Sequence, residues 1–145
     1  MKRIITLCFA IIGLCCCAMA HPVDQETAKD IAVKFMGTNN VRLSTTYSIG
    51  DDVAAFYVFN TEDGFVIVSA NDCETPIIGY SHEGRFDPNN VPVQMEDYLR
   101  DFVARIQYGI ENHIEADELT AKQWNWYGQL ADSAKASPTI PSGPC

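Results

Sequence analysis

The sequence predicts an α+β domain in which an antiparallel sheet of three to four strands is packed by an N-terminal helix and two C-terminal helices. Three observations predict this fold. An amphipathic pattern with helical period comes first, runs rich in β-branched and aromatic residues follow it, and two more amphipathic patterns come after them. Strands that are joined by short turns, with the helices grouped at either end, are typical of an α+β domain.

Residues 24–36 carry the pattern of the first helix. Apolar residues recur at helical spacing and form one stripe, made of Ala28, Ile31, Ala32, Phe35 and Met36. Asp24 stands where its side chain can accept from the free backbone N–H groups of the first turn, so we expect it to be the N-cap. Gly37 follows the stripe and can adopt the positive φ that ends a helix. The stripe is expected to face the core.

Four segments in the middle of the chain are typical of strands. Residues 53–60 and 64–70 carry β-branched and aromatic residues on both faces and are separated by turn residues, which predicts a hairpin of central strands. We expect helices to cover one face of these strands and something other than helices to cover the other face. Residues 41–49 are polar enough for an edge strand. Residues 76–81 begin with Pro76, which has no N–H and fits a strand start or an edge.

Two more helices are expected after an irregular loop at residues 82–91. Residues 92–112 carry a long apolar stripe and begin with Pro92, which suits the first turn of a helix. Its stripe consists of Met95, Leu99, Phe102, Val103, Ile106 and Ile110. Residues 116–131 form the third expected helix, whose apolar residues are Leu119, Trp126, Tyr127 and Leu130. Residues 133–145, rich in Ser, Pro, Gly and Ala, are expected to form a flexible tail.

An aromatic cluster near the end of the third expected helix has two interpretations. Its members are Trp124, Trp126 and Tyr127. Such residues either fill the core or form a patch that faces a partner, since Trp and Tyr are favoured as interface anchors. The sequence leaves both interpretations open.

Residues 1–20 are typical of a secretory signal peptide. A short basic start precedes an apolar run, and Ala18-Met19-Ala20 is the small-x-small pattern that signal peptidase recognises. We therefore expect cleavage near Ala20, export from the cytoplasm to the periplasm or the medium, and one folded domain at residues 21–132. Cysteines at positions 15–17 raise the alternative of a lipoprotein anchor. That alternative is weaker, because the residues before these cysteines are not the small ones that lipid-modifying enzymes prefer.

The charge of the chain excludes two classes of partner. There are 10 Lys and Arg against 19 Asp and Glu, which gives a net charge of −9. Nucleic-acid binding needs a basic surface, so no nucleic-acid partner is expected. An acidic surface is equally unsuited to anionic lipid. No second apolar run is long enough to span a membrane, and no membrane insertion is expected.

No arrangement of residues predicts a catalytic or metal site. None of His21, His82 and His113 has the spacing of a metal ligand set or lies beside a nucleophile. A dyad of Cys73 with His82 is disfavoured, because the acidic neighbours of Cys73 raise the pKa of its thiol. We expect no catalytic residues, no metal and no cofactor. Cys73 and Cys145 remain after signal cleavage and have two possible fates, a disulfide or free thiols.

Three stretches in the middle of the chain carry a family resemblance. They are YVFN at residues 57–60, GFVIVSAND at residues 64–72 and PIIGYSHEGRFD at residues 76–87, and the helix around Met95 follows them. In their order and spacing these stretches resemble the propeptide of the streptopain family of secreted cysteine proteases and the Spi-type stand-alone inhibitors built on it. The resemblance extends over about residues 24–111.

The resemblance implies a secreted inhibitor of a streptopain-like cysteine protease, which blocks the active-site cleft of that enzyme as a propeptide mimic and is not itself a protease. In that family an asparagine of the loop before the long helix enters the substrate cleft. Here the loop is residues 85–91, in which Asn90 matches best and Asn89 second, with Phe86, Asp87 and Pro88 as further contacts. An alternative is that both asparagines are ordinary turn residues, chosen for their tolerance of the left-handed conformation. The free protein is expected to be monomeric.

Three other functions remain as alternatives to inhibition. A detached prosegment would help a separately encoded protease to fold. A remnant of a truncated protease gene would have no function. A small enzyme that uses Cys73 and His82 is the least favoured, because the sequence around Cys73 gives no means of activating the thiol.

Overall fold

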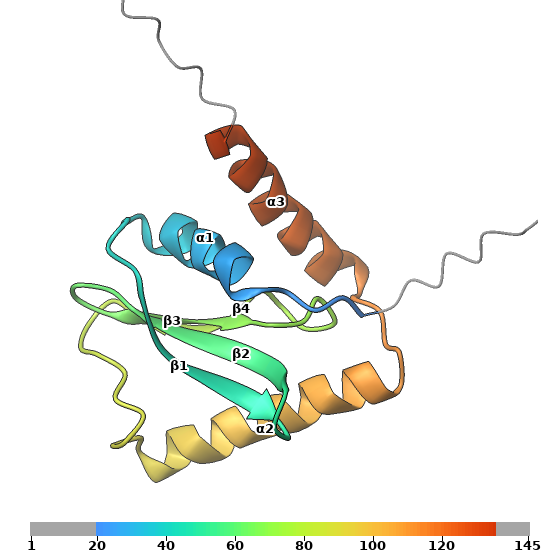
Figure 1. Cartoon of the computed structure of the whole chain (residues 1–145), viewed down its shortest axis with the longest axis horizontal. Helices are drawn as coiled ribbons and strands as arrows, with labels where there is room; N and C mark the ends of the chain where they lie inside the picture. Colours follow the sequence, from blue (N-terminus) through green and yellow to red (C-terminus); the bar gives the residue numbers. More distant parts are fainter. Residues whose placement is uncertain (1–19, 136–145) are drawn as a thin grey trace, which may run out of the picture.

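The elements of the chain follow one another in the predicted order. The computed structural model describes residues 20–135 (Figure 1). The elements are α1 (Gln25–Met36), β1 (Arg42–Ile49), β2 (Val53–Asn60), β3 (Phe65–Ser69), β4 (Ile77–Ser81), α2 (Val93–Glu111) and α3 (Glu118–Lys135). The predicted α+β fold is confirmed. The proposed signal peptide lies outside the described residues but for Ala20. The proposed tail at residues 133–145 also lies outside them but for its first three residues, which belong to α3. The domain limits stay predictions.

The four strands form one antiparallel sheet in the order β1-β2-β3-β4. β1 and β4 are the edges of the sheet. The polar composition of residues 41–49 predicted this position for β1, and Pro76 is compatible with it for β4. The β2–β3 hairpin is closed by Thr61, whose N–H donates to the carbonyl oxygen of Gly64 over 2.8 Å. At Gly64 the chain passes so close to β4 that a Cβ atom would lie 2.1 Å from the carbonyl oxygen of Ser81. Only glycine fits at this position.

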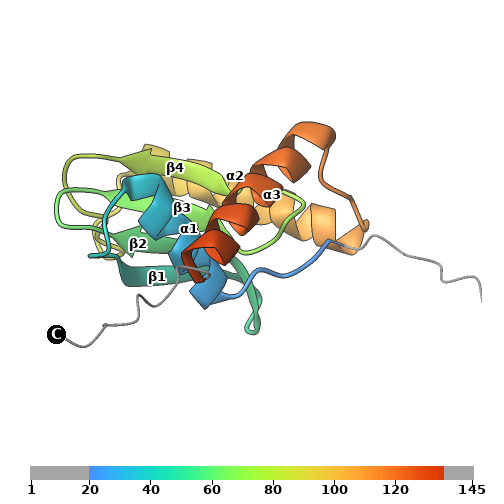
Figure 2. The same ribbon diagram turned by 90° about the horizontal axis from the view of Figure 1, so that it is seen from above.

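Helices cover both faces of the sheet, so the fold has three layers (Figures 1 and 2). Side chains alternate along the central strands. One set of buried residues meets α1 and consists of Tyr57, Phe59, Val66 and Val68. The other set meets α2 and consists of Phe56, Val58 and Ile67. The expectation that something other than helices covers the second face is therefore wrong, because the long helix α2 covers it through Leu99, Phe102 and Ile106.

The ends of α1 and α2 differ in how they are capped. Asp24 is the N-cap of α1, where its Oδ1 accepts from the N–H of Thr27 over 2.8 Å, and Gly37 ends the helix with φ of 68°. That hydrogen bond lowers the pKa of Asp24 below its usual value. Pro92 lies one residue earlier than expected, at the N-cap of α2, and its carbonyl oxygen accepts from Glu96. None of the described helices is both long and apolar enough to cross a membrane.

Helix α3 lies on the same side of the sheet as α1 and runs to Lys135, beyond the end at residue 131 that the sequence predicted. Trp124 and Tyr127 are half-buried and pack against the α1 side of the core. Leu119 and Trp126, by contrast, are 67% and 61% exposed. The aromatic cluster thus splits between the two interpretations.

Candidate functional site

The loop between β4 and α2 is anchored by one buried side chain, Phe86. This residue is 5% exposed, and its ring makes edge contacts with the rings of Tyr47 and Phe65, at centroid distances of 6.4 and 5.6 Å. It was expected among the protease-contacting residues. Its side chain lies in the core instead, so its role in the free chain is to hold the loop in place.

The backbone of Phe86 is held by the side chain of Asn60, at the end of β2. The Oδ1 atom of Asn60 accepts from the N–H of Phe86 over 2.8 Å, and its Nδ2 donates to the Phe86 carbonyl oxygen over 2.9 Å. We call this pair of hydrogen bonds the Asn60 clamp. The hydroxyl of Ser44 donates to the same carbonyl oxygen over 3.2 Å. Because Asn60 is buried, water does not compete for these bonds.

Directly after the anchor, Asp87, Pro88, Asn89 and Asn90 form a β-turn, named here the 87–90 turn. The carbonyl oxygen of Asp87 accepts from the N–H of Asn90 over 3.0 Å, and its carboxylate accepts from the N–H of Asn89 over 3.0 Å. Proline at the second position of such a turn has the required φ in advance. The turn is therefore ordered by its own residues before any partner binds.

The four residues of the 87–90 turn are exposed, and the side-chain amides of Asn89 and Asn90 make no hydrogen bond with the described residues. Neither asparagine has a positive φ, because His113 is the only non-glycine residue with one in the described part of the chain. A need for the left-handed conformation therefore does not explain these asparagines. Both amides remain available to a partner.

A cavity of about 250 Å³ lies beside the 87–90 turn. The loop side of its lining comes from Arg85, Phe86, Asp87 and Asn90, and the rest from Phe65 and the residues that lead into α2. Apolar walls with a few polar groups are typical of a binding pocket. The turn and this cavity together present both a protrusion and a recess.

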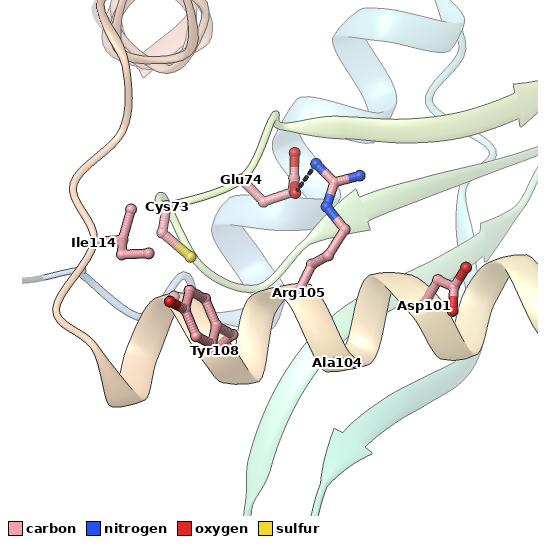
Figure 3. Close-up of a pocket in the computed structure, with 8 residues that line it drawn as sticks. Cys73, Glu74, Asp101, Ala104, Arg105, Tyr108 and Ile114 are labelled. Atoms are coloured by element: carbon pink, nitrogen blue, oxygen red, sulfur yellow. Dashed lines mark ion pairs between the residues drawn. The ribbon is translucent and has the colours of Figure 1, made fainter.

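Cys73 lies away from this loop, in a separate cavity of about 600 Å³ between the β3–β4 turn and α2 (Figure 3). Burial raises the pKa of its thiol, and the carboxylates of Glu74 and Asp72 raise it further. Glu74 itself pairs with Arg105 over 2.7 Å. A thiol that is held protonated in this way is a poor nucleophile.

His82 does not complete a dyad with Cys73. The two residues stand at opposite ends of the five-residue strand β4, which spans roughly 16 Å at about 3.3 Å per residue. The ring of His82 packs instead against Tyr80, at a centroid distance of 5.3 Å. Residues 20–135 also contain no group of three His, Cys, Asp or Glu side chains that could hold a metal ion. Cys145 lies outside the described residues, so the two alternatives for these cysteines, a disulfide or free thiols, stay open.

Sequence reasoning missed Asn60 and Ser44, the residues that hold the loop. Asn60 was treated only as the last residue of a strand. The signal available was its polarity, because an amide at the end of a strand of buried apolar residues needs a partner inside the protein. The sequence does not say which backbone group that partner is.

The chain belongs to the Spi protease inhibitor family, whose model matches residues 20–106. This match includes the Asn60 clamp and the 87–90 turn and ends inside α2. Among curated proteins, the Thiol protease/hemagglutinin PrtT of Porphyromonas gingivalis is 31% identical over 118 residues. The alignment covers 70% of this chain and 13% of that protein, so the chain spans a small part of its relative. No solved structure matches significantly. The family and the relative support a role as a protease inhibitor or a propeptide.

Proposed function

We propose that the chain is a secreted inhibitor of a streptopain-like cysteine protease and that the 87–90 turn enters the active-site cleft of that enzyme. The observation that carries this proposal is the exposed turn itself, which is closed by its own hydrogen bonds and fixed on one side by the Asn60 clamp. Peptide cleavage requires the scissile bond to approach the nucleophile in a near-attack geometry. A closed turn fills the cleft without offering a bond in that geometry.

Pre-organisation favours tight binding by such a turn. Fixing the backbone of one residue costs about 1–2 kcal/mol, and a turn that is already ordered avoids this cost on docking. An interface of about 1,600 Å² in total is then sufficient for a stable complex. The acidic surface of the chain speeds its encounter with a basic enzyme, in a manner that salt suppresses.

The inhibitory role is tested by titrating streptopain-like and papain-like proteases with the purified chain. We expect loss of activity in the former only. The double variant Asn89→Ala/Asn90→Ala should weaken inhibition more than tenfold, since a loss of about 1.4 kcal/mol of binding energy is a tenfold change. Asn125→Ala, an exposed asparagine on α3, is the matched control. An unchanged inhibition constant in the double variant would remove the turn from the mechanism.

A folding role for the same domain has support from the relative. The match covers only 13% of that thiol protease, which leaves room for a separate catalytic domain, as in a zymogen with a propeptide. A prosegment of this kind raises the refolding yield when it is present before the denatured protease is diluted. An inhibitor lowers the activity of enzyme that has already folded. Adding the chain before or after refolding therefore separates the two roles.

Export with cleavage after Ala20 is also part of the proposal. The backbone N–H of His21 donates to Oδ1 of Asp72 over 2.6 Å, and the N–H of Asp72 donates to the carbonyl oxygen of His21 over 3.1 Å. Cleavage before His21 would turn this donor into an ammonium group that faces a carboxylate, which strengthens the contact. The mass of the exported protein tests this, because a lipoprotein would instead begin at a cysteine of positions 15–17.

A further inference from the structure

A small polar recess lies beside the 87–90 turn, at the end of the sheet where β1 begins and β2 ends. Its volume is about 150 Å³, which is room for about five water molecules at about 30 Å³ each. Its lining consists of Asn40, Arg42, Asn60, Thr61, Glu62 and Arg85. Arg85 also lines the cavity of about 250 Å³ beside the turn, so the two hollows are neighbours. The recess is therefore continuous with the surface that we propose meets the protease.

Two arginines of the recess, Arg42 and Arg85, have no partner in the described part of the chain. Neither guanidinium group makes a hydrogen bond or an ion pair with residues 20–135. The other two arginines of this range, Arg100 and Arg105, both pair with carboxylates. A guanidinium group has five N–H donors in a planar fork, whose shape matches a carboxylate. Two unused forks around one small hollow therefore favour a carboxylate as its occupant.

The buried side chain of Asn60 fixes the backbone of both arginines. Arg42 stands directly across from Asn60 in the pairing of β1 with β2. Arg85 comes just before Phe86, whose N–H and carbonyl oxygen are held by the Asn60 clamp. The backbone segments that carry the two guanidinium groups are thus in place before a partner arrives. Only the two side chains have to be ordered on binding, which keeps its entropic cost low.

The charge of the recess differs from the charge of the chain as a whole. The chain has a net charge of −9, whereas the recess has two arginines and one carboxylate, Glu62, which leaves one positive charge in excess. Glu62 is exposed and pairs with neither guanidinium group. An acidic group of a partner is therefore attracted to this place on an otherwise acidic chain.

We propose that the recess binds the carboxylate of an aspartate or glutamate side chain that lies beside the active-site cleft of the target protease. This inference rests on the proposed function, because it takes the 87–90 turn as the part that enters the cleft. Arg42 and Arg85 donate to the carboxylate from two sides of the recess. The contact holds the turn in one orientation, and it selects proteases that have an acidic residue at this position.

The test compares inhibition constants toward a streptopain-like protease that the wild-type chain inhibits. Arg42→Gln/Arg85→Gln removes both positive charges and should raise the inhibition constant about ten- to hundredfold, because hydrogen bonds between charged groups are the strong ones. Arg42→Glu/Arg85→Glu should raise it further, because like charges then face each other across the interface. Both side chains are exposed and unpaired within residues 20–135, so the urea midpoint should stay at the wild-type value in both variants.

Lys29→Glu/Lys122→Glu is the matched control for the charge reversal. It changes the net charge of the chain by the same amount, at exposed positions on α1 and α3. Charges that are separated from the interface by more than a Debye length are largely screened, so the inhibition constant should stay within about twofold of the wild type. An equal effect of the lysine and arginine reversals would overturn the proposal, because the effect would then belong to the net charge.

Two other results would also overturn the proposal. One is wild-type inhibition by Arg42→Gln/Arg85→Gln. The other is an inhibition constant of Arg42→Glu/Arg85→Glu no higher than that of the glutamine variant, because the occupant would then not be acidic. In both cases a loss of inhibition in Asn89→Ala/Asn90→Ala would leave the proposed function standing. If the wild-type chain inhibits no streptopain-like protease, the proposed function is wrong and this inference is wrong with it.

Discussion

Removal of the Asn60 clamp by Asn60→Ala should affect both stability and inhibition. The Phe86 N–H loses its acceptor inside the protein, which costs about 1–3 kcal/mol for a buried donor, and the hydrogen bond to the Phe86 carbonyl contributes about 1 kcal/mol more. That carbonyl keeps its bond to Ser44. The free energy of unfolding should therefore fall by about 2–4 kcal/mol. If one residue of the loop must be re-ordered on binding, at about 1–2 kcal/mol, the inhibition constant rises roughly five- to thirty-fold.

Urea unfolding and protease titration measure the two effects of Asn60→Ala, the first through the midpoint and slope of the transition. Ser44→Ala is the matched control, because it removes the third bond to Phe86 and keeps the clamp. It should cost about 0.5–1.5 kcal/mol and leave inhibition nearly unchanged. The reasoning is refuted if Asn60→Ala and Ser44→Ala destabilise the chain equally, or if Asn60→Ala leaves the inhibition constant at the wild-type value in protein that is still folded.

Three further substitutions test the fold. Asp24→Ala should cost about 1 kcal/mol at neutral pH. Folding lowers the pKa of Asp24, so its stabilising effect is present above the pKa of the unfolded chain and is lost as the pH falls through the pKa of the folded chain. Urea unfolding near pH 2 should therefore show a smaller difference in stability between the wild type and Asp24→Ala than at neutral pH. An equal difference at both pH values contradicts this. Gly109→Ala should destabilise the chain by about 1–3 kcal/mol, since a Cβ atom would lie 2.7 Å from the Sγ atom of Cys73. Gly128 has open space around it, so Gly128→Ala should stabilise α3 by up to about 1 kcal/mol. A similar loss of melting temperature in Gly109→Ala and Gly128→Ala would rule out the close contact between Gly109 and Cys73.

Most of the fold was predictable from the sequence because its signals are local. The stripe and caps of α1, the two central strands and the edge position of β4 depend on residues that are neighbours in the chain. The errors fell where local patterns are weak. The end of α3 was placed too early, and the sequence did not reveal that Leu119 and Trp126 are exposed. A helix with few core contacts has no strong stripe to reveal which side is buried.

The candidate site was predictable only in part. The resemblance located the loop and its two asparagines, and the structure places both on an exposed, ordered turn. It did not reveal that Phe86 is an anchor in the core. Nor did it reveal that Asn60, 26 residues earlier, holds the backbone of Phe86. Such contacts depend on the path of the loop over the sheet, which follows from packing and not from any local pattern.

The amino-acid order by itself determined the secondary structure, the division of apolar residues between the two faces of the sheet and the lack of a basic surface, because each follows from the types and spacing of nearby residues. Tertiary structure alone decided three things. It joined Asn60 to Phe86, it kept His82 and Cys73 at opposite ends of β4, and it buried part of Trp124 while leaving Trp126 exposed. The physical reason is that these outcomes depend on strand register and on how helices cross the sheet, which only the packed chain defines.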